Sequence, residues 1–240
     1  MPSSSTPWAL DHVVIIVEDL ATAVADFEAL GFRVELGGRN GPVHNALIYL
    51  SDGTYIELTC PVSKVTRGLF RILHRLRLLA LLEWTRPGLM HRFYAWFGGP
   101  VGLQDWCVRV VDLDGCRQDA VAGGVQMAEA RPFRRTRPDG AVAEWRLVAP
   151  TRRAEPFWIE DVSAVEVRVP WRDCCVHPNG AEGIRAVVVR SAPSVSMQGV
   201  SYRVADDVPA HRLRLEVRCS GDKKGVLPLH QTSNAWIELV

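Results

Sequence analysis

The sequence lacks an excess of charge of either sign, because 28 lysines and arginines stand against 27 aspartates and glutamates. A chain with so little net charge has no global field to attract nucleic acid, although local patches remain allowed. The GxGxxG and Walker signatures of nucleotide-binding loops and the GxSxG motif of nucleophilic hydrolases are also absent. We therefore expect no nucleic-acid partner.

The sequence also lacks paired cysteines and a secretory signal. Its six cysteines form no CxxC pair and no disulfide-framework spacing, so we interpret them as reduced thiols in the core. The first ten residues have neither the basic start nor the apolar stretch of a signal peptide. We therefore expect a cytoplasmic protein.

An internal repeat is the main feature that the sequence does have. With 48% hydrophobic and 23% charged residues, the 240 residues have the composition of a globular protein with a substantial core. Two strand-like runs, 10–20 and 103–113, both close on Asp-Leu. Two later segments, 54–58 and 157–161, both place an acid in a closing strand. An internal duplication of this kind decides the fold class.

Four side chains that could bind a metal ion fall at matching places of the repeat. His12 and Asp105 each stand seven residues before the Asp of their Asp-Leu pair (19 − 12 and 112 − 105). Glu57 follows His12 by 45 residues (57 − 12), and Glu160 follows Asp105 by 55 (160 − 105). The duplication therefore predicts that four ligands from two modules surround one centre.

Each copy is predicted to form a strand, a helix and three further strands. In the first copy, the patterns favour strands at about 10–18, 32–37, 44–50 and 53–59, and a helix at 20–30. In the second copy, they favour strands near 103–111, 125–134, 141–149 and 156–162, and a helix at 114–122. The predicted fold class is α+β, with tandem βαβββ modules.

The expected modules cover residues 8–62 and 101–163. The insert between them, 63–100, contains a basic amphipathic segment at 66–82 that is too short and too charged to span a bilayer. We expect it to be a lid or packing helix, with membrane-surface contact as the less favoured alternative. Residues 176–240 are predicted to form a degenerate third module without a helix. Its strand edges favour a homodimer.

The chain resembles the vicinal oxygen chelate superfamily, and more narrowly its glyoxalase-like domain branch. The resemblance rests on the duplication and on segments 10–14, 45–49, 55–58, 137–140 with Trp145, 156–161 and 177–181. It implies a cup-shaped mixed sheet. The superfamily includes glyoxalase I, extradiol dioxygenases, epimerases and metal-free drug-binding proteins. The family usually has a His near the position of Arg39, whereas His44 stands in this chain.

The predicted metal ligands are His12, Glu57, Asp105 and Glu160, an oxygen-rich set that suits Mn²⁺, Mg²⁺, Fe²⁺, Ni²⁺ or Zn²⁺ without selecting one. An extradiol dioxygenase would need two His and one carboxylate as ligands. Because this set has Asp105 in place of a second His, we expect dioxygen chemistry less than the alternatives. The resemblance implies that a divalent ion binds two neighbouring oxygens of the substrate and stabilises an enolate or oxyanion. Glu160, which Asp161 follows, is the predicted catalytic base.

Other residues are candidates for the pocket. His44 is predicted to act as a second catalytic group, with a structural role as its alternative. Arg109 either binds an anionic substrate or neutralises the acids beside it. Tyr55 and Trp158 are predicted to contact the substrate, although core packing is the usual role of tryptophan.

Two functions follow from the sequence. The first is a metal-dependent isomerase or lyase that acts on a small oxygenated metabolite. The alternative is a metal-free protein of the same fold that binds a small molecule or confers resistance to it. A surface-binding role of the insert is a third hypothesis. The sequence leaves the substrate open, because pocket shape and loops set it.

Overall fold

The computed structural model describes residues 8–40, 43–76, 89–137, 140–170, 173–209, 213–221 and 224–240. Residues 77–82 of the predicted insert helix and the Pro138-Asp139 turn lie outside these ranges.

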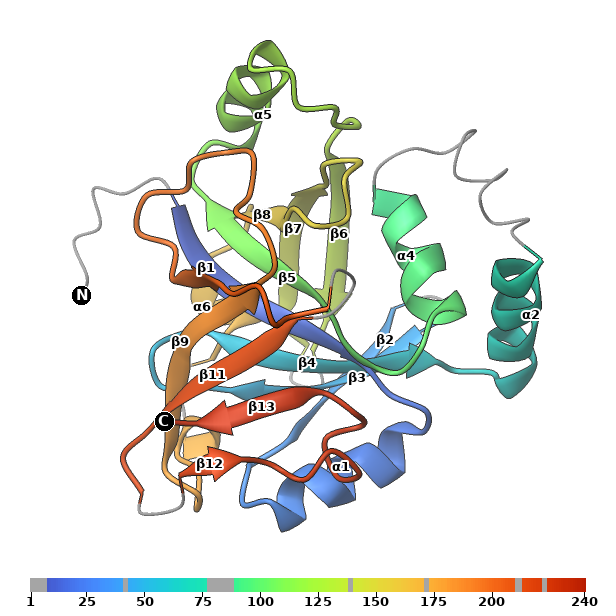
Figure 1. The fold of residues 1–240 in the computed structure, drawn as a ribbon, viewed down its shortest axis with the longest axis vertical. Coiled ribbons are helices and arrows are strands. Elements are labelled where there is room, and N and C mark those ends of the chain that lie inside the picture. Colours follow the sequence, from blue (N-terminus) through green and yellow to red (C-terminus); the bar gives the residue numbers. More distant parts are fainter. Residues whose placement is uncertain are drawn as a thin grey trace.

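Both copies of the repeat fold as βαβββ modules (Figure 1). The first module consists of β1 (Trp8–Ile16), α1 (Leu20–Ala29), β2 (Glu35–Asn40), β3 (Val43–Tyr49) and β4 (Tyr55–Pro61). The second consists of β5 (Gly102–Val110), α5 (Leu113–Ala122), β6 (Arg131–Thr136), β7 (Val142–Val148) and β8 (Phe157–Asp161). This order confirms the predicted α+β class with tandem βαβββ modules.

The repeated Asp-Leu pair begins the helix of each module. Asp19 accepts a hydrogen bond from Thr22 N at 2.9 Å and caps α1, and Asp112 accepts one from Gly115 N at 2.9 Å and caps α5. Carboxylates are favoured at this position because they satisfy an amide that has no partner within the helix. The strongest signal of the duplication is therefore a helix-capping signal.

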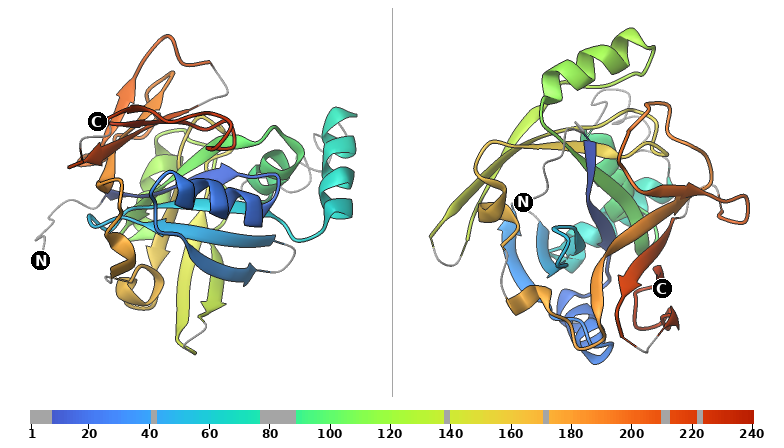
Figure 2. Two further views of the ribbon diagram at one scale, coloured as in Figure 1. Left: turned by 90° about the horizontal axis from the view of Figure 1, so that it is seen from below. Right: turned by 90° about the vertical axis from the view of Figure 1, so that its left-hand side faces the viewer.

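The two modules share one curled sheet with the strand order β2-β3-β4-β1-β5-β8-β7-β6 (Figure 2). The first strands of the modules, β1 and β5, pair antiparallel at its centre, and each pairs in parallel with the last strand of its own module. Side chains alternate between the two faces of β1. Val13 and Ile15 join the larger hydrophobic core, whereas Val14 and Ile16 join a second core on the opposite face.

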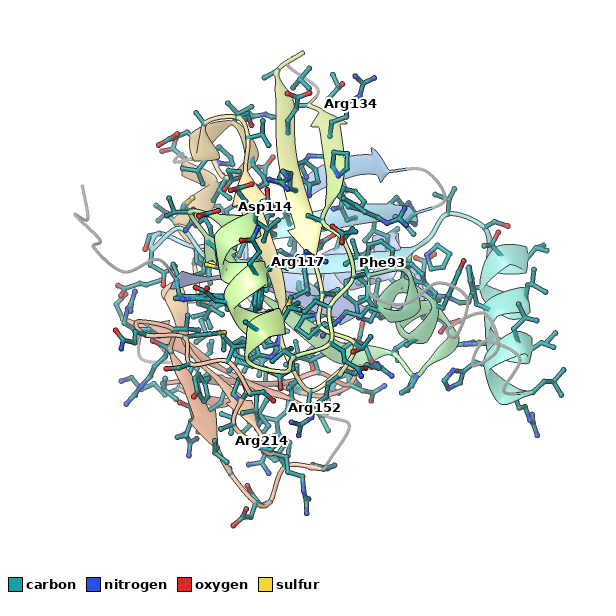
Figure 3. All side chains as sticks on the ribbon, turned by 90° about the horizontal axis from the view of Figure 1, so that it is seen from above. Phe93, Asp114, Arg117, Arg134, Arg152 and Arg214 are labelled. Carbon is teal, nitrogen blue, oxygen red and sulfur yellow. The ribbon has the colours of Figure 1, made fainter. Side chains whose placement is uncertain are left out.

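The insert contributes α2 (Lys64–Arg75) and α4 (Leu89–Gly98), which pack against each other beside the sheet. Buried Arg67 of α2 donates hydrogen bonds to the carbonyl oxygens of Val17 and Glu18, just after β1. No helix among the described residues is long and apolar enough to cross a membrane. Helix α5 of the second module lies apart from the two insert helices and carries Asp114 and Arg117 (Figure 3).

A short connection, α6 (Val165–Arg168) and a 3₁₀ turn η1 (Asp173–Cys175), leads to the third module. This module forms a separate sheet of β9 (Ala181–Val189), β10 (Tyr202–Val204), β11 (Arg214–Cys219), β12 (Gly225–Val226) and β13 (Trp236–Leu239). Its described residues contain no helix between β9 and β11. Its apolar side chains Val187, Leu215 and Ile237 join the larger core.

His177 ties the third module to the first. Its Nδ1 accepts a hydrogen bond from Arg33 N at 2.9 Å, and its Nε2 lies 2.9 Å from the carbonyl oxygen of Tyr49. The ring therefore carries its proton on Nε2 and donates it to Tyr49. Burial lowers the pKa of His177 below its ordinary value. The folded protein thus requires the neutral ring.

Because the folded pKa of His177 is lowered, the unfolded chain binds this proton first. The stability contribution of His177 should be complete above about pH 6.5 and should fall as the pH drops below that value. We predict that His177→Gln flattens the pH dependence of the urea midpoint between pH 7.5 and 5.5. Identical pH slopes in wild type and variant would contradict this assignment.

Candidate functional site

A cavity of about 360 Å³ lies between the large sheet and the two insert helices. Its wall is mostly aromatic and aliphatic, and its polar groups gather on the strands of the first module. The lining residues are His12, Val43, Asn45, Leu47, Tyr55, Glu57, Thr59, Pro61, Thr66, Phe70, Phe93, Tyr94, Trp96, Phe97, Phe133, Arg135, Trp145, Leu147, Phe157, Ile159 and Arg168. Mostly apolar walls with a few convergent polar groups are typical of ligand sites.

His12 of β1 faces this cavity and is held by the residue before it. The β1·β5 register shifts between Leu10 and His12, so a β-bulge interrupts the strand at Asp11. Such a bulge redirects side chains. Asp11 Oδ1 lies 2.6 Å from His12 Nδ1, and both residues are buried. An ionised Asp11 can only accept, so Nδ1 donates the proton and the lone pair of Nε2 faces Glu57.

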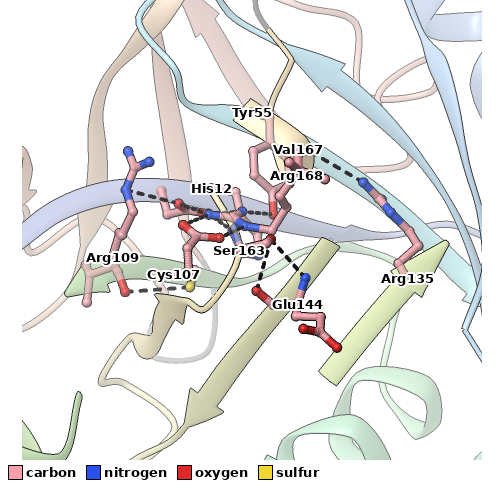
Figure 4. Close-up of polar contacts among 12 residues, drawn as sticks. His12, Tyr55, Cys107, Arg109, Arg135, Glu144, Ser163, Val167 and Arg168 are labelled. Carbon is pink, nitrogen blue, oxygen red and sulfur yellow. Dashed lines mark hydrogen bonds and ion pairs between the residues drawn. The ribbon is translucent and has the colours of Figure 1, made fainter. Parts of the chain in front are cut away.

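Arg168 of α6 keeps Asp11 ionised (Figure 4). Its guanidinium donates to both oxygens of Asp11 at 2.9 and 2.8 Å, to both oxygens of Asp161 at 2.6 and 2.9 Å, and to Tyr55 Oη at 3.0 Å. Burial alone would raise the pKa of Asp11, but the charge of Arg168 and the bond to His12 hold it well below its usual range. Burial raises the pKa of Tyr55, which stays a neutral phenol.

Glu57 of β4 completes the polar wall. Its Oε2 lies 3.7 Å from His12 Nε2, and its Oε1 accepts a hydrogen bond from Asn45 Nδ2 at 2.8 Å. The Tyr55 ring stacks on His12 at a centroid distance of 4.4 Å and fixes the plane of the imidazole. His12 and Glu57 are therefore an oriented imidazole–carboxylate pair that opens into an apolar cavity.

A family model for the glyoxalase-like domain matches residues 10–201. The chain belongs to this family. The match confirms the resemblance to the glyoxalase-like branch of the vicinal oxygen chelate superfamily. A search of curated protein sequences found no match.

Solved structures align with this glyoxalase-like chain. A hypothetical protein from Staphylococcus aureus aligns with a TM-score of 0.69 and 12% identity, over 97% of this chain and 99% of that chain. Methylmalonyl-CoA epimerase from Mycobacterium tuberculosis aligns with a TM-score of 0.40 and 20% identity, over 67% and 91%. The Mn(II)-bound glyoxalase from Novosphingobium aromaticivorans aligns with 0.39 and 9%, over 88% and 64%. The likeness to the Staphylococcus aureus protein, at 12% identity, concerns the fold alone.

Of the four predicted ligands, the structure brings His12 and Glu57 together and places Asp105 and Glu160 elsewhere. The strand register is the reason. Across the central seam, His12 pairs with Cys107, and Asp105 lies opposite Val14. Tyr55 pairs with His12, and Phe157 pairs with Cys107. In the glyoxalase-like fold of this chain, the second-module counterparts of His12, Tyr55 and Glu57 are therefore Cys107, Phe157 and Ile159.

Asp105 is a buried anchor for α4. Arg92 Nη1 lies 2.8 Å from each of its carboxylate oxygens, and Trp96 Nε1 donates to it at 3.0 Å. Arg92 also donates to the carbonyl oxygens of Pro150 and Glu155, at 3.2 and 2.6 Å. Asp105 therefore positions the aromatic face of α4 against the cavity and has no oxygen atom without a partner.

Glu160 points to the opposite face of β8 from Ile159, which lines the cavity. It accepts hydrogen bonds from Leu113 N at 3.1 Å and from Arg146 Nη1 at 3.0 Å. Its carboxylate thus lies at the beginning of α5, where the helix dipole favours negative charge. The predicted base does not reach the cavity.

The other predicted pocket residues divide between the cavity wall and the core. Tyr55 lines the cavity, and Arg109 Nε lies 3.6 Å from Asp11 Oδ2, so Arg109 helps to neutralise that acid. His44 Nε2 lies 2.9 Å from Cys60 Sγ and does not line the cavity. Trp158 packs edge-on against Trp8 in the larger core, at a centroid distance of 4.8 Å. Strand alternation explains Trp158, since its neighbours Phe157 and Ile159 occupy the cavity face.

Sequence reasoning missed Asp11, Arg168, Asn45 and Arg135. Strict alternation places Asp11 on the face opposite His12, and only the bulge overrides it. Arg168 belongs to the connection after β8, which has no counterpart in the repeat. Asn45 was a usable signal, because it alternates with apolar residues on a strand that pairs with β4.

The donor chemistry decides which residues fit a metal ion. Ligand atoms of Asp11, His12 and Cys107 lie within 4.8 Å of one another. However, the guanidinium of Arg168 occupies both oxygens of Asp11 and would repel a cation. Burial raises the pKa of the Cys107 thiol well above its usual value, so it stays protonated. His12 Nε2 and the Glu57 carboxylate do fit, because a metal-binding His commonly donates its other N–H to a carboxylate such as Asp11.

We predict that Asp105→Asn destabilises the protein strongly and without any metal present, because it leaves the buried charge of Arg92 uncompensated. Removing one partner of such a buried pair lowers the free energy of unfolding by about 3–5 kcal/mol. The double variant Arg92→Met with Asp105→Leu should recover much of that loss. The measurement is urea unfolding in the presence of a chelator.

Asp114→Asn is the matched control for this experiment. Asp114 pairs with Arg146 at 2.7 Å but is exposed, so its loss should change the urea midpoint only slightly. An Asp105→Asn protein as stable as the Asp114→Asn protein would argue against the anchor.

Proposed function

We propose that this glyoxalase-like protein is an enzyme that moves a proton on a small, largely apolar compound bearing oxygen. The observation that carries the proposal is the oriented His12–Glu57 pair, which is placed in an aromatic cavity and backed by Asp11. A general base must lie within reach of the substrate and keep a defined tautomer. His12 meets both requirements.

The residues of the cavity wall have different roles in this proton transfer. Asp11 holds His12 by Nδ1 and stabilises the imidazolium that forms when Nε2 takes a proton. Glu57 lies close enough to share that proton or to return it to another atom of the substrate. Arg168 keeps Asp11 charged, and the aromatic side chains exclude water, which strengthens electrostatic interactions at the site. Isomerisation and elimination both require proton movement of this kind.

A divalent cation would be held by His12 Nε2 and the carboxylate of Glu57, with substrate or water oxygens as the remaining ligands. When bound, it would supply Lewis-acid polarisation of a substrate oxygen. The second module offers no ligand at the equivalent positions, where Cys107, Phe157 and Ile159 stand. Apart from Arg135 of β6, the described residues of the second module contribute only apolar and aromatic side chains to the wall.

That apolar half of the cavity supports a second function, a metal-free protein that binds an apolar small molecule without converting it. The same cavity would then serve for sequestration, and His12 and Glu57 would bind a polar group of the ligand. Cation binding and proton exchange separate the two functions.

We predict that wild type binds one Mn²⁺ per chain by isothermal titration calorimetry. His12→Ala and Glu57→Ala should each weaken this binding by at least about tenfold, and Asp11→Asn by about 10–100-fold, because it loosens a ligand. Glu160→Gln is the matched control and should bind Mn²⁺ as wild type does, since Glu160 faces away from the cavity. Equal affinity in wild type and His12→Ala would leave metal-free function as the better proposal.

We predict further that wild type catalyses deuterium uptake from D₂O into a small oxygenated compound with an acidic C–H bond, followed by proton NMR across a panel of such compounds. His12→Ala and Glu57→Gln should lose this exchange, whereas Glu160→Gln should keep it. Compounds that bind tightly yet never exchange would favour sequestration over catalysis.

A further inference from the structure

Arg135 of β6 is a cationic side chain of the cavity wall for which the described residues provide no counter-charge. It lines the cavity, yet it forms no ion pair with a described carboxylate. Its Nε is buried without a hydrogen-bond partner. Its Nη2 makes only long contacts, 3.5 Å to Tyr49 Oη and 3.4 Å to the carbonyl oxygen of Arg168. A guanidinium that is partly desolvated and unpaired is costly for the fold alone.

The other charged groups of the wall do not share this property. Arg168 is saturated by Asp11 and Asp161, and Glu57 is held by Asn45. Two further acids, Glu35 and Asp173, line a neighbouring hollow that Arg135 also borders. Neither forms an ion pair with Arg135. Among the described charged groups of this wall, the guanidinium of Arg135 is therefore the one whose hydrogen-bond donors lack good partners.

Asn45 lies between Arg135 and the His12–Glu57 pair. A Cβ atom at Gly37 would lie 2.3 Å from Asn45 Oδ1 and 3.2 Å from Arg135 Nη1, so both groups lie against the same glycine. Asn45 in turn holds Glu57. The order along the wall is thus Arg135, Asn45, Glu57 and His12, and a ligand held by Arg135 extends naturally toward His12.

We infer that Arg135 binds the carboxylate of the cavity's ligand, and that the ligand is a small carboxylic acid with an aromatic or branched apolar body. A guanidinium offers a planar pair of donors that matches a carboxylate. The apolar body packs against Phe93, Trp96 and Phe133 of the opposite wall. A cavity of about 360 Å³ suits a ligand of that size. This inference rests on the proposed function of the site but concerns binding rather than turnover.

The test compares phenylacetate with its neutral isostere phenylacetamide, by quenching of the fluorescence of Trp96 and Trp145 and by calorimetry. Wild type should bind phenylacetate at least about tenfold more tightly, because a hydrogen bond between two charged groups is stronger than one to a neutral amide. Arg135→Gln should abolish that preference while it keeps the affinity for phenylacetamide, which also reports an intact cavity. Arg135→Lys should keep part of it, because the charge remains.

Arg134→Gln is the matched control. Arg134 is the preceding residue of β6, pairs across the hairpin with Glu144 and is exposed near the outer end of the hairpin (Figure 3). The variant removes the same charge from the opposite face of the strand and should keep the full preference for phenylacetate.

The outcomes separate this inference from the proposed function. If wild type shows no preference for phenylacetate or binds neither probe, or if Arg135→Gln keeps the preference, the carboxylate assignment is overturned whatever the proton-exchange assay shows. If Arg135→Gln alone loses the preference, the assignment is supported. Absence of proton exchange in wild type would then overturn only the proposed catalytic function.

Discussion

The buried ion pair between Asp11 and Arg168 is the interaction on which the site depends. Charges withdrawn from water are tolerated only when they are paired and hydrogen-bonded. Arg168 meets this condition by joining Asp11 of β1, Asp161 of β8 and Tyr55 of β4. One guanidinium thus connects strands of both modules behind the cavity wall. Because Asp11 stays ionised, His12 keeps one tautomer and one orientation, and its Nε2 faces Glu57.

A second buried ion pair holds the insert helix α4, which forms the aromatic wall of the cavity. Arg92 and Asp105 are a buried guanidinium–carboxylate pair that fixes α4 on β5. The effect is to hold Phe93 and Trp96 rigidly against the cavity. Two buried pairs therefore position two walls of different character, one polar and one aromatic. The duplication gives the sheet, but the chemistry of the cavity comes from residues that the two copies do not share.

The sequence predicted the order of strands and helices because hydrophobic periodicity and helix caps are local signals. The Asp-Leu pairs mark Asp19 and Asp112 as caps, and His12 and Glu57 were placed correctly on one wall. Register was not predictable in the same way. Counted back from the caps, Asp105 matches His12, but the strand pairing matches Cys107, two residues later. The connection between strand and helix accounts for one of these two residues, since three residues separate β1 from α1 and two separate β5 from α5. The other arises because β1 continues four residues beyond His12, whereas β5 continues three beyond Cys107. A slip of one residue likewise places Glu160 on the outer face.

The asymmetry of the two half-sites has a mechanistic consequence. A set of four ligands would fix a cation entirely by protein groups, and substrate would have to compete for the remaining positions. Here the two groups that could bind a cation, His12 and Glu57, both belong to the first module, whereas Phe157 and Ile159 of the second provide an apolar surface. The imidazole–carboxylate contact between His12 and Glu57, at 3.7 Å, is electrostatically stronger in these surroundings than in water, because low-polarity walls screen it little. The apolar surface that the second module places beside His12 and Glu57 therefore strengthens the electrostatic interactions on which their chemistry depends.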